Sequence, residues 1–271
     1  MRFFTLFFCC FLGLFATTSK LKVAVSIDPQ AFFVKKIGGD SVETIILVPK
    51  NKNPEHYEPL FSQAKLLKDS DVYFGIGLEF ETKWKERFLS INPKMDFIDL
   101  SHYHNQDFHH KHDAHIWLSI VLAKEQAREI FEVLAKKDIK NQQKYKQNLE
   151  AFLEEIEVLD KKIKNLFEQK NTQKTFLVYH PAFEYFSKEY NLEELAIEMH
   201  NKETKIKHLQ KLNQMIKQKN LKVIYKQPQF STKQVELLAK EHHLKISTLD
   251  PFAFDWLENM WDIAQKIAYE K

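Results

Sequence analysis

Four side chains able to bind a transition metal stand in separate short motifs of the chain. They are His56 in NPEHYEP, His115 in DAHIWLS, His180 in VYHPAFEYF and Asp250 in STLDPF. Three imidazoles and one carboxylate suit tetrahedral zinc, because borderline-soft Zn(II) accepts nitrogen readily while manganese favours more oxygen ligands. Such a set also leaves no coordination position open for a water molecule to be activated. The pattern therefore indicates capture and release of a metal ion better than catalysis.

The surroundings of these residues favour a rigid site, although each histidine alone is also compatible with an ordinary loop position. Four of the eight prolines lie within three residues of one of the four positions, and proline stiffens a loop: Pro54, Pro59, Pro181 and Pro251. Glu55 leaves three alternatives open: it substitutes for the Asp250 carboxylate, it orients a ligand from outside the coordination sphere, or it is a surface carboxylate.

The segment SHYHNQDFHHKHDAHIW, residues 101–117, holds six of the twelve histidines. His115 belongs to the HIWLS motif, and the other five fall in the loop before it: His102, His104, His109, His110 and His112. Neutral imidazoles on a loop bind metal transiently, so this loop could raise the local metal concentration or supply a second, weaker site. The alternative is a solvated loop whose histidines have no specific role.

The elements that must position these residues read as alternating strands and helices. Short strand-type runs occur in the first half at KVAVSI (22), TIILVP (44), DVYFGI (71) and DFIDL (96), and in the second half at TFLVY (175), LKVIY (221) and LKISTL (244). Amphipathic stretches such as HLQKLNQMIKQK and TKQVELLAKEH separate the later runs. The sequence therefore predicts an α/β protein of two similar lobes, each a small, mainly parallel sheet flanked by helices. The metal ligands are expected at the carboxyl ends of the strands, in a cleft between the lobes.

One long helix is predicted to join the lobes. Apolar side chains recur in steps of three and four at Tyr145, Leu149, Phe152, Ile156, Leu159, Ile163 and Leu166. About 28 helical residues would span roughly 42 Å, and no glycine or proline interrupts them. The predicted division is a signal peptide at 1–19, an N-terminal lobe at 20–140, a rigid connecting helix at 141–169 and a C-terminal lobe at 170–271.

Composition narrows the function and the compartment. The formal charge is +3, from 40 basic and 37 acidic residues interspersed along the chain, which argues against a nucleic-acid partner. Arg2 precedes an apolar run of fourteen residues that reads as a secretory signal peptide, and this run contains both cysteines. Metal binding must then use histidines and carboxylates. With five glycines and none beyond Gly77, nucleotide chemistry is improbable, and no organic cofactor is expected.

Five motifs in order resemble a known family over essentially the whole chain: PEHYEP, HIWLS, YHPAFEYF, KQPQFSTK and TLDPF. The family is that of the cluster A-I solute-binding proteins of ABC importers, most closely the zinc-uptake ZnuA type. The resemblance implies a monomer that captures Zn(II) in the periplasm and delivers it to a membrane permease with its cytoplasmic ATPase. It also implies that His56, His115, His180 and Asp250 bind the metal.

The chain departs from the family pattern at three points: Ile120 replaces the usual proline after HIWLS, no disulfide is available, and the histidine loop is short. A histidine at position 180 resembles the zinc branch rather than the manganese branch. The alternatives are a carrier of manganese or another divalent metal, and a surface adhesin stabilised by metal. A secreted metallohydrolase is a weaker alternative, because it needs an open coordination position and a general base, and no HExxH motif occurs.

Overall fold

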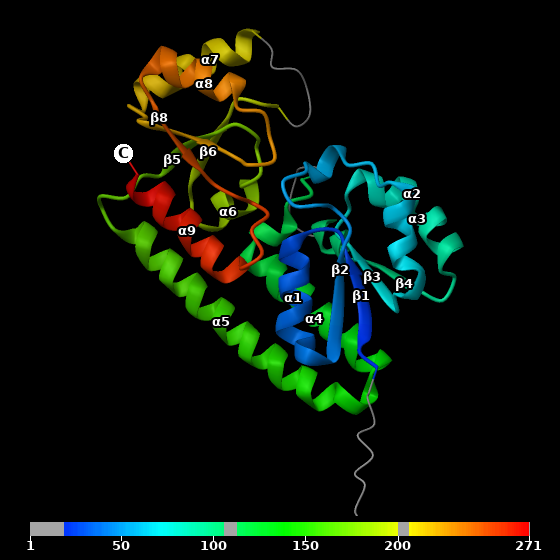
Figure 1. Ribbon diagram of the computed structural model, residues 1–271. Coiled ribbons are helices and arrows are strands. Elements are labelled where there is room, and N and C mark those ends of the chain that lie inside the picture. Colours follow the sequence, from blue (N-terminus) through cyan, green and yellow to red (C-terminus); the bar gives the residue numbers. More distant parts are fainter. Residues whose placement is uncertain (1–18, 106–112, 200–205, 271) are drawn as a thin grey trace, which may run out of the picture.

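The computed structural model describes residues 19–105, 113–199 and 206–270, with two α/β lobes bridged by one long helix (Figure 1). The N-terminal sheet has the order β2-β1-β3-β4, formed by Leu21–Val25 (β1), Val42–Ile46 (β2), Val72–Gly75 (β3) and Asp96–Asp99 (β4). The C-terminal sheet has the order β6-β5-β7-β8, formed by Thr175–Val178 (β5), Glu193–Ala196 (β6), Val223–Lys226 (β7) and Lys245–Thr248 (β8). Every pairing is parallel, and both sheets connect their strands in the same order. The predicted fold class is confirmed.

Helices cover the sheets and carry the chain between parallel strands. The α-helices are Asp28–Gly38 (α1), Phe61–Ala64 (α2), Glu79–Ile91 (α3), Ile120–Lys137 (α4), Gln142–Glu168 (α5), Glu184–Glu189 (α6), Ile206–Gln218 (α7), Lys233–His242 (α8) and Trp256–Tyr269 (α9). Short 3₁₀ turns lie at Gly39–Ser41 (η1), Pro54–His56 (η2), Lys65–Asp69 (η3), Leu100–Asn105 (η4), Ile116–Leu118 (η5) and Ile139–Asn141 (η6). The two amphipathic stretches expected in the second half correspond to α7 and α8.

The long helix α5 has 27 residues and runs along both lobes (Figure 1). The predicted apolar stripe is its buried face, which packs against α1 and α4 of the N-terminal lobe and against α9 of the C-terminal lobe. Each buried apolar side chain on this stripe contributes about 1.5–3 kcal/mol to stability. Because α5 buries one continuous face against both lobes, it fixes them to a common support.

The hydrophobic core follows the alternation of side chains along the strands. In the C-terminal sheet, Phe176 and Val178 of β5 face a core that includes α5, α9 and the N-terminal lobe, whereas Leu177 faces a separate core under α7 and α8. In β7, Tyr225 faces the larger core and Ile224 faces the core under α7 and α8. The larger core therefore extends without interruption from one lobe into the other.

A buried polar network fixes the carboxyl ends of β1 and β3. The Glu81 carboxylate accepts hydrogen bonds from the Ser26 hydroxyl and from the backbone N–H groups of Ile76 (2.9 Å), Gly77 (2.8 Å) and Leu78 (3.0 Å). Burial raises the pKa of Glu81 to about 7, while these hydrogen bonds act in the opposite direction. Gly77 has a φ of 84° there, a conformation that glycine adopts without strain. The network makes this edge of the N-terminal sheet rigid.

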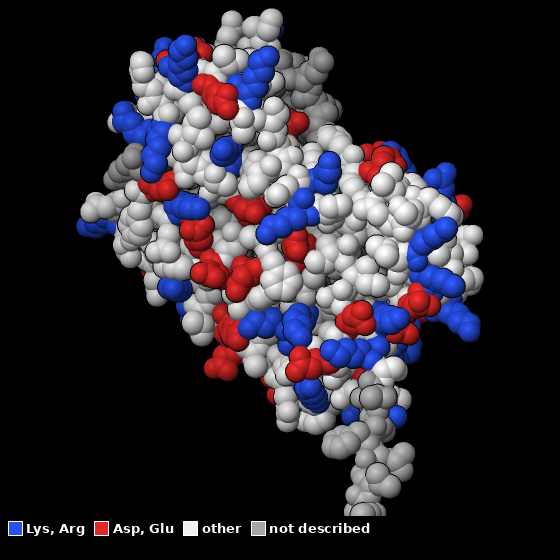
Figure 2. Space-filling view, viewed as in Figure 1, with Lys and Arg blue, Asp and Glu red and all other residues white. Residues whose placement is uncertain are grey.

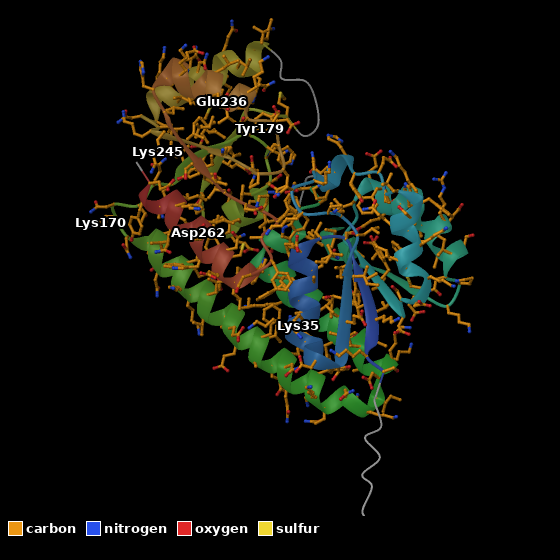
Figure 3. The ribbon with its side chains drawn as sticks, in the orientation of Figure 1. Lys35, Lys170, Tyr179, Glu236, Lys245 and Asp262 are labelled. Carbon is orange, nitrogen blue, oxygen red and sulfur yellow. The ribbon has the colours of Figure 1, made fainter. Side chains whose placement is uncertain are left out.

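The surface shows no dominant charge on the face seen in Figure 2, where blue and red side chains are interspersed among the residues that the figure colours. Charged side chains such as Lys35 on α1, Lys170 after α5 and Asp262 on α9 lie on the outside of the lobes (Figure 3). Within the described residues, no helix combines the length and apolar character needed to cross a bilayer. The predicted signal peptide lies outside the described residues.

Candidate metal site

Glu55, His115 and His180 converge between the lobes. Their nearest potential ligand atoms, one from each residue, lie within 4.8 Å of one another. Glu55 Oε1 is 3.2 Å from His180 Nε2 and 3.6 Å from His115 Nε2, and the two imidazole centroids are 5.3 Å apart. The histidines are 1–2% exposed. Two ring nitrogens and a carboxylate oxygen thus point into one small, buried space.

Glu55 is presented by the 3₁₀ turn η2, which begins after β2 and its loop. Pro54 occupies the first position of this turn, where its missing N–H is no loss, and the Asn53 side chain accepts a hydrogen bond from Glu55 N at 3.0 Å. Close by, Glu58 accepts a hydrogen bond from the Trp84 indole at 3.0 Å. These local contacts hold the NPEHYEP motif against the N-terminal lobe.

His115 is oriented by Asp113, two residues earlier in the chain. Asp113 Oδ1 lies 2.6 Å from His115 Nδ1 and accepts a hydrogen bond from His115 N at 3.0 Å. A carboxylate at Nδ1 places the ring proton on that nitrogen and leaves the Nε2 lone pair for a metal. His115 Nε2 is buried and makes no hydrogen bond within the described residues. This nitrogen is therefore prepared for an ion.

His180 is held by residues of the C-terminal lobe at its backbone, its ring face and its Nδ1 atom. The fully buried Gln227 accepts a hydrogen bond from His180 N at 3.2 Å and donates one to His180 O at 2.6 Å. The imidazole stacks on Phe230 with centroids 4.3 Å apart, and Glu198 Oε2 lies 2.6 Å from Nδ1. Gln227 and Phe230 both belong to KQPQFSTK, so this motif supports the histidine.

Electrostatics determine the protonation of His180 before a metal enters. Burial lowers the pKa of this imidazole, but the hydrogen bonds and charges of Glu198 and Glu55 outweigh burial and raise the pKa to about 9. The metal-free protein at neutral pH therefore carries a proton between His180 Nε2 and Glu55. A metal ion binding to these two atoms displaces that proton.

Two residues predicted as ligands lie apart from this cluster. His56 is exposed and borders a hollow of about 170 Å³ that Glu55, Glu58, Glu79 and Lys83 also line. Asp250 is partly buried, and its Oδ1 accepts hydrogen bonds from Gln229 Nε2 at 2.8 Å and from Phe252 N at 3.0 Å. Asp250 lines a narrow gap of about 20 Å³ to which Pro54 also contributes. The structure thus brings together two of the four predicted ligands with Glu55, which the sequence left open as a substitute for the Asp250 carboxylate.

The histidine-rich loop is described only at its start. His102 Nδ1 lies 2.7 Å from the Asp99 carbonyl, and its Nε2 is 3.6 Å from Glu129 on α4. The side chain of His104 and the whole of His109, His110 and His112 lie outside the described residues. Whether this segment forms a second metal site stays a prediction.

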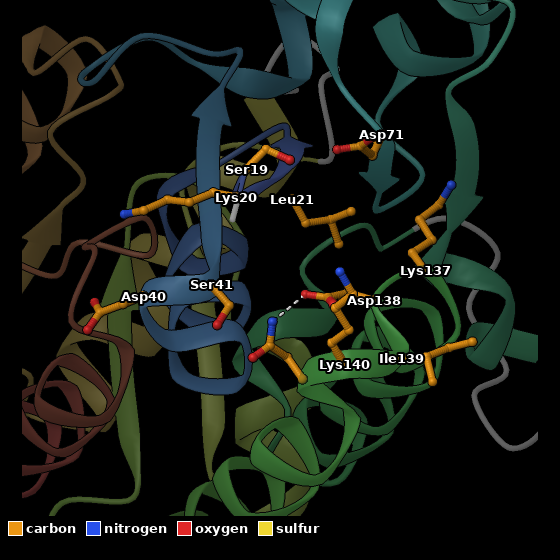
Figure 4. A pocket seen from close by; sticks show the side chains of 11 residues that line it. Ser19, Lys20, Leu21, Asp40, Ser41, Asp71, Lys137, Asp138, Ile139 and Lys140 are labelled. Atoms are coloured by element: carbon orange, nitrogen blue, oxygen red, sulfur yellow. Dashed lines mark hydrogen bonds between the residues drawn. The ribbon is translucent and has the colours of Figure 1, made fainter. Parts of the chain in front are cut away.

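A pocket of about 660 Å³ lies away from the cluster, at the amino end of the N-terminal sheet (Figure 4). It is bordered by Leu21 at the start of β1, by Asp71 before β3 and by the turn η6, where Asn141 donates a hydrogen bond to Asp138 at 2.7 Å. Lysines and aspartates are mixed along its wall. Since the candidate metal ligands follow the carboxyl ends of strands, this hollow is not part of their site.

Sequence reasoning missed the residues that orient the two histidines: Asp113, Glu198, Gln227 and Phe230. Asp113 could have been found, because an aspartate two residues before a histidine can reach the Nδ1 atom of that histidine. Glu198 follows the edge strand β6 and meets His180 only through the fold, so no local signal points to it.

The sequence model described as "Zinc-uptake complex component A periplasmic" (ZnuA) matches residues 23–269. The chain belongs to the ZnuA family. The high-affinity zinc uptake system protein ZnuA of Bacillus subtilis is 28% identical over 251 residues, covering 85% of this chain and 78% of that protein. A solved structure of a ZnuA is 38% identical, covers 92% of this chain and 98% of that one, and superposes with a TM-score of 0.86.

A relative whose name specifies no particular metal also matches. The metal ABC transporter substrate-binding lipoprotein SsaB of Streptococcus sanguinis is 32% identical over 188 residues, which cover 65% of this chain and 61% of that protein. The ZnuA family supplies the substrate-binding components of zinc importers, and the donor set fits that cargo. The predicted family and the predicted cargo, zinc, are confirmed.

The carboxylates behind the two histidines provide the first test of this site. We expect Asp113→Ala and Glu198→Ala each to weaken zinc binding by about 10–100-fold, because losing the partner at Nδ1 releases the orientation and tautomer of a ligand. Asp113→Asn and Glu198→Gln are milder controls, since an amide oxygen still accepts the Nδ1 proton. Competitive zinc titration measures the effect, and equal affinity of the alanine variants and the parent would contradict it.

Proposed function

We propose that this chain captures Zn(II) in the periplasm as a monomer and delivers it to the permease of an ABC importer. Capture takes place between the lobes, with Glu55, His115 and His180 as the central ligands. Asp250 or His56 completes the coordination after a local rearrangement. The observation that carries the proposal is the convergence of two buried Nε2 atoms, one from each lobe, on a single carboxylate.

The donor set supports zinc over manganese. Two imidazole nitrogens and one carboxylate suit borderline-soft Zn(II), and manganese prefers more oxygen ligands. The hydrogen bonds that the two Nδ1–H groups donate to Asp113 and Glu198 raise the basicity of both imidazoles, which strengthens their bonds to a zinc ion. The burial of the histidines also restricts water at the ion, so we infer that the site works by binding and release rather than by hydrolysis.

Competition between zinc and manganese for the purified protein, beginning at Lys20, tests this function. We expect one zinc ion per chain to bind tightly and to be retained against an excess of manganese. In cells, loss of the gene should slow growth in chelator-treated medium, and zinc rather than manganese should restore it. Tight zinc binding without any defect in zinc uptake would favour the adhesin alternative. Preferential binding of manganese would overturn the cargo assignment.

A further inference from the structure

A carboxylate from the C-terminal lobe caps a helix of the N-terminal lobe next to the metal site. Glu189, at the end of α6, accepts hydrogen bonds from the Ser119 hydroxyl, from Ile120 N at 2.9 Å and from Val121 N at 3.3 Å. These groups form the start of α4, only four to six residues after His115. The first N–H groups of a helix have no partner within the helix, so they need acceptors from elsewhere.

Each of these N–H groups has an acceptor. Glu189 serves Ile120 and Val121, the Ser119 hydroxyl oxygen accepts from Leu122 N at 3.0 Å, and Ala123 N makes the first bond of the helical ladder, to Ser119 O at 2.9 Å. The negative charge of Glu189 also lies at the positive end of the α4 dipole. Since Ser119 is fully buried, water cannot readily replace Glu189 there.

A second contact from α6 reaches the chain just before His115, whereas Glu189 binds the chain just after it. Tyr185, four residues before Glu189 and therefore on the same face of α6, donates a hydrogen bond from its hydroxyl to Asp113 O at 3.3 Å. Asp113 orients His115, and Glu189 holds the helix that follows it. The helix α6 thus contacts the chain on both sides of His115, and it begins four residues after His180. It is a short link between the two histidine ligands.

We propose that Glu189 is a positioning residue for zinc: by capping α4 across the lobe boundary, it holds His115 at the distance from His180 that the ion requires. Glu189 does not touch the ion. This inference rests on the proposed zinc capture, because its effect is read in zinc affinity.

The test compares Glu189→Ala and Glu189→Gln with the parent by competitive zinc titration. We expect Glu189→Ala to raise the Kd for zinc by about tenfold or more. Glu189→Gln should have a smaller effect in the same direction, because one carbonyl oxygen remains as an acceptor. The control is Glu184→Ala, which removes a carboxylate from the same helix that pairs with Lys188 at 2.6 Å, and its Kd should stay within twofold of the parent.

Thermal unfolding separates positioning from simple support of the fold. A positioning role makes the rise in Tm on zinc addition smaller in the Glu189 variants than in the parent. A purely structural role lowers the Tm of the metal-free and zinc-loaded forms equally and leaves the Kd unchanged, and that result would overturn the inference while zinc capture stands. A parent that binds no zinc would instead overturn the proposed function and this inference with it.

Ile120→Pro gives an independent check. Ser119 has an extended backbone (φ −95°, ψ 127°), which admits a following proline, and proline is favoured at the first position of a helix. The proline ring removes the N–H that Glu189 binds and displaces the carboxylate. We expect Ile120→Pro to weaken zinc binding, because it removes one of the three hydrogen bonds that Glu189 accepts. The double variant with Glu189→Ala should bind zinc no more weakly than Glu189→Ala alone, because that change already removes all three bonds. Fully multiplicative effects would show that Glu189 acts elsewhere.

Discussion

We expect alanine at His115 or His180 to lower the affinity for zinc by more than about a hundredfold, a larger loss than we expect from removing a supporting carboxylate. Each histidine supplies a buried Nε2 atom, and the remaining ligands cannot replace it, because the ring that carries it is fixed by a carboxylate at Nδ1. Competitive titration with a zinc-binding dye measures the loss. His208→Ala is a suitable control, since His208 lies on α7 and contacts the Ala196 carbonyl at 2.8 Å.

The same titration distinguishes Glu55 from its neighbour His56. Because Glu55 lies between the two histidines and His56 is exposed, we expect Glu55→Ala to weaken binding strongly and His56→Ala to change the Kd only a few-fold. A large loss with His56→Ala alone would mean that zinc draws His56 into the site in place of Glu55. Asp250→Ala tests the remaining position, and a marked loss there would identify Asp250 as the ligand that completes the set.

Zinc affinity should increase with pH between about 6.5 and 9. The pKa of His180 in the metal-free protein is about 9, so at pH 7 zinc must displace a proton from this imidazole. Each unit of pH decrease in this interval then weakens binding by about tenfold, or about 1.4 kcal/mol, from His180 alone. Titration at several pH values measures the slope, and calorimetry in buffers of different ionisation enthalpy measures the proton released.

The stability of the metal-free protein should change in the opposite direction. A histidine whose folded pKa lies above its ordinary value of 6.5 contributes stability that is complete below pH 6.5 and is lost as the pH rises through about 9. The Tm of the metal-free form should therefore fall over the interval in which zinc affinity rises. Glu198→Gln removes one charge that raises the pKa of His180. The fall in Tm and the rise in zinc affinity should therefore both occur at lower pH in this variant. An affinity independent of pH would contradict this account.

Most of the fold follows from local patterns. Seven of the eight strands begin within a few residues of the predicted runs, and α5 has the expected buried stripe, because burial on one face imposes a periodicity that the sequence displays. The strand β6 was missed. Its sequence EELA begins with two glutamates, which are uncommon in strands, and it lies at the edge of the sheet, where only one side is paired.

The sequence predicted the two histidines that converge, but it did not predict whether Glu55 or His56 faces them. The backbone at His115 is fixed locally, by Asp113 two residues earlier. The backbone at His180 is hydrogen-bonded by Gln227, which is 47 residues away and reaches it only through the fold. Glu55 and His56 are adjacent on one short turn, and the rotation of that turn decides which of them faces inward. Local sequence does not determine that rotation, because the motif also contacts distant segments, as in the hydrogen bond from Trp84 to Glu58.

The core that runs from the N-terminal lobe through α5 and α9 into one face of the C-terminal sheet has a consequence for how the protein can be dissected. A fragment beginning after α5 would expose the faces of β5, β7 and α9 that this core covers, including Phe176, Tyr225 and Ile263. Such a fragment would present a large apolar surface to water and would aggregate before it could be studied. The lobes look like two modules in outline, but they share the larger of the two cores, so neither lobe can be expected to fold without the other and α5.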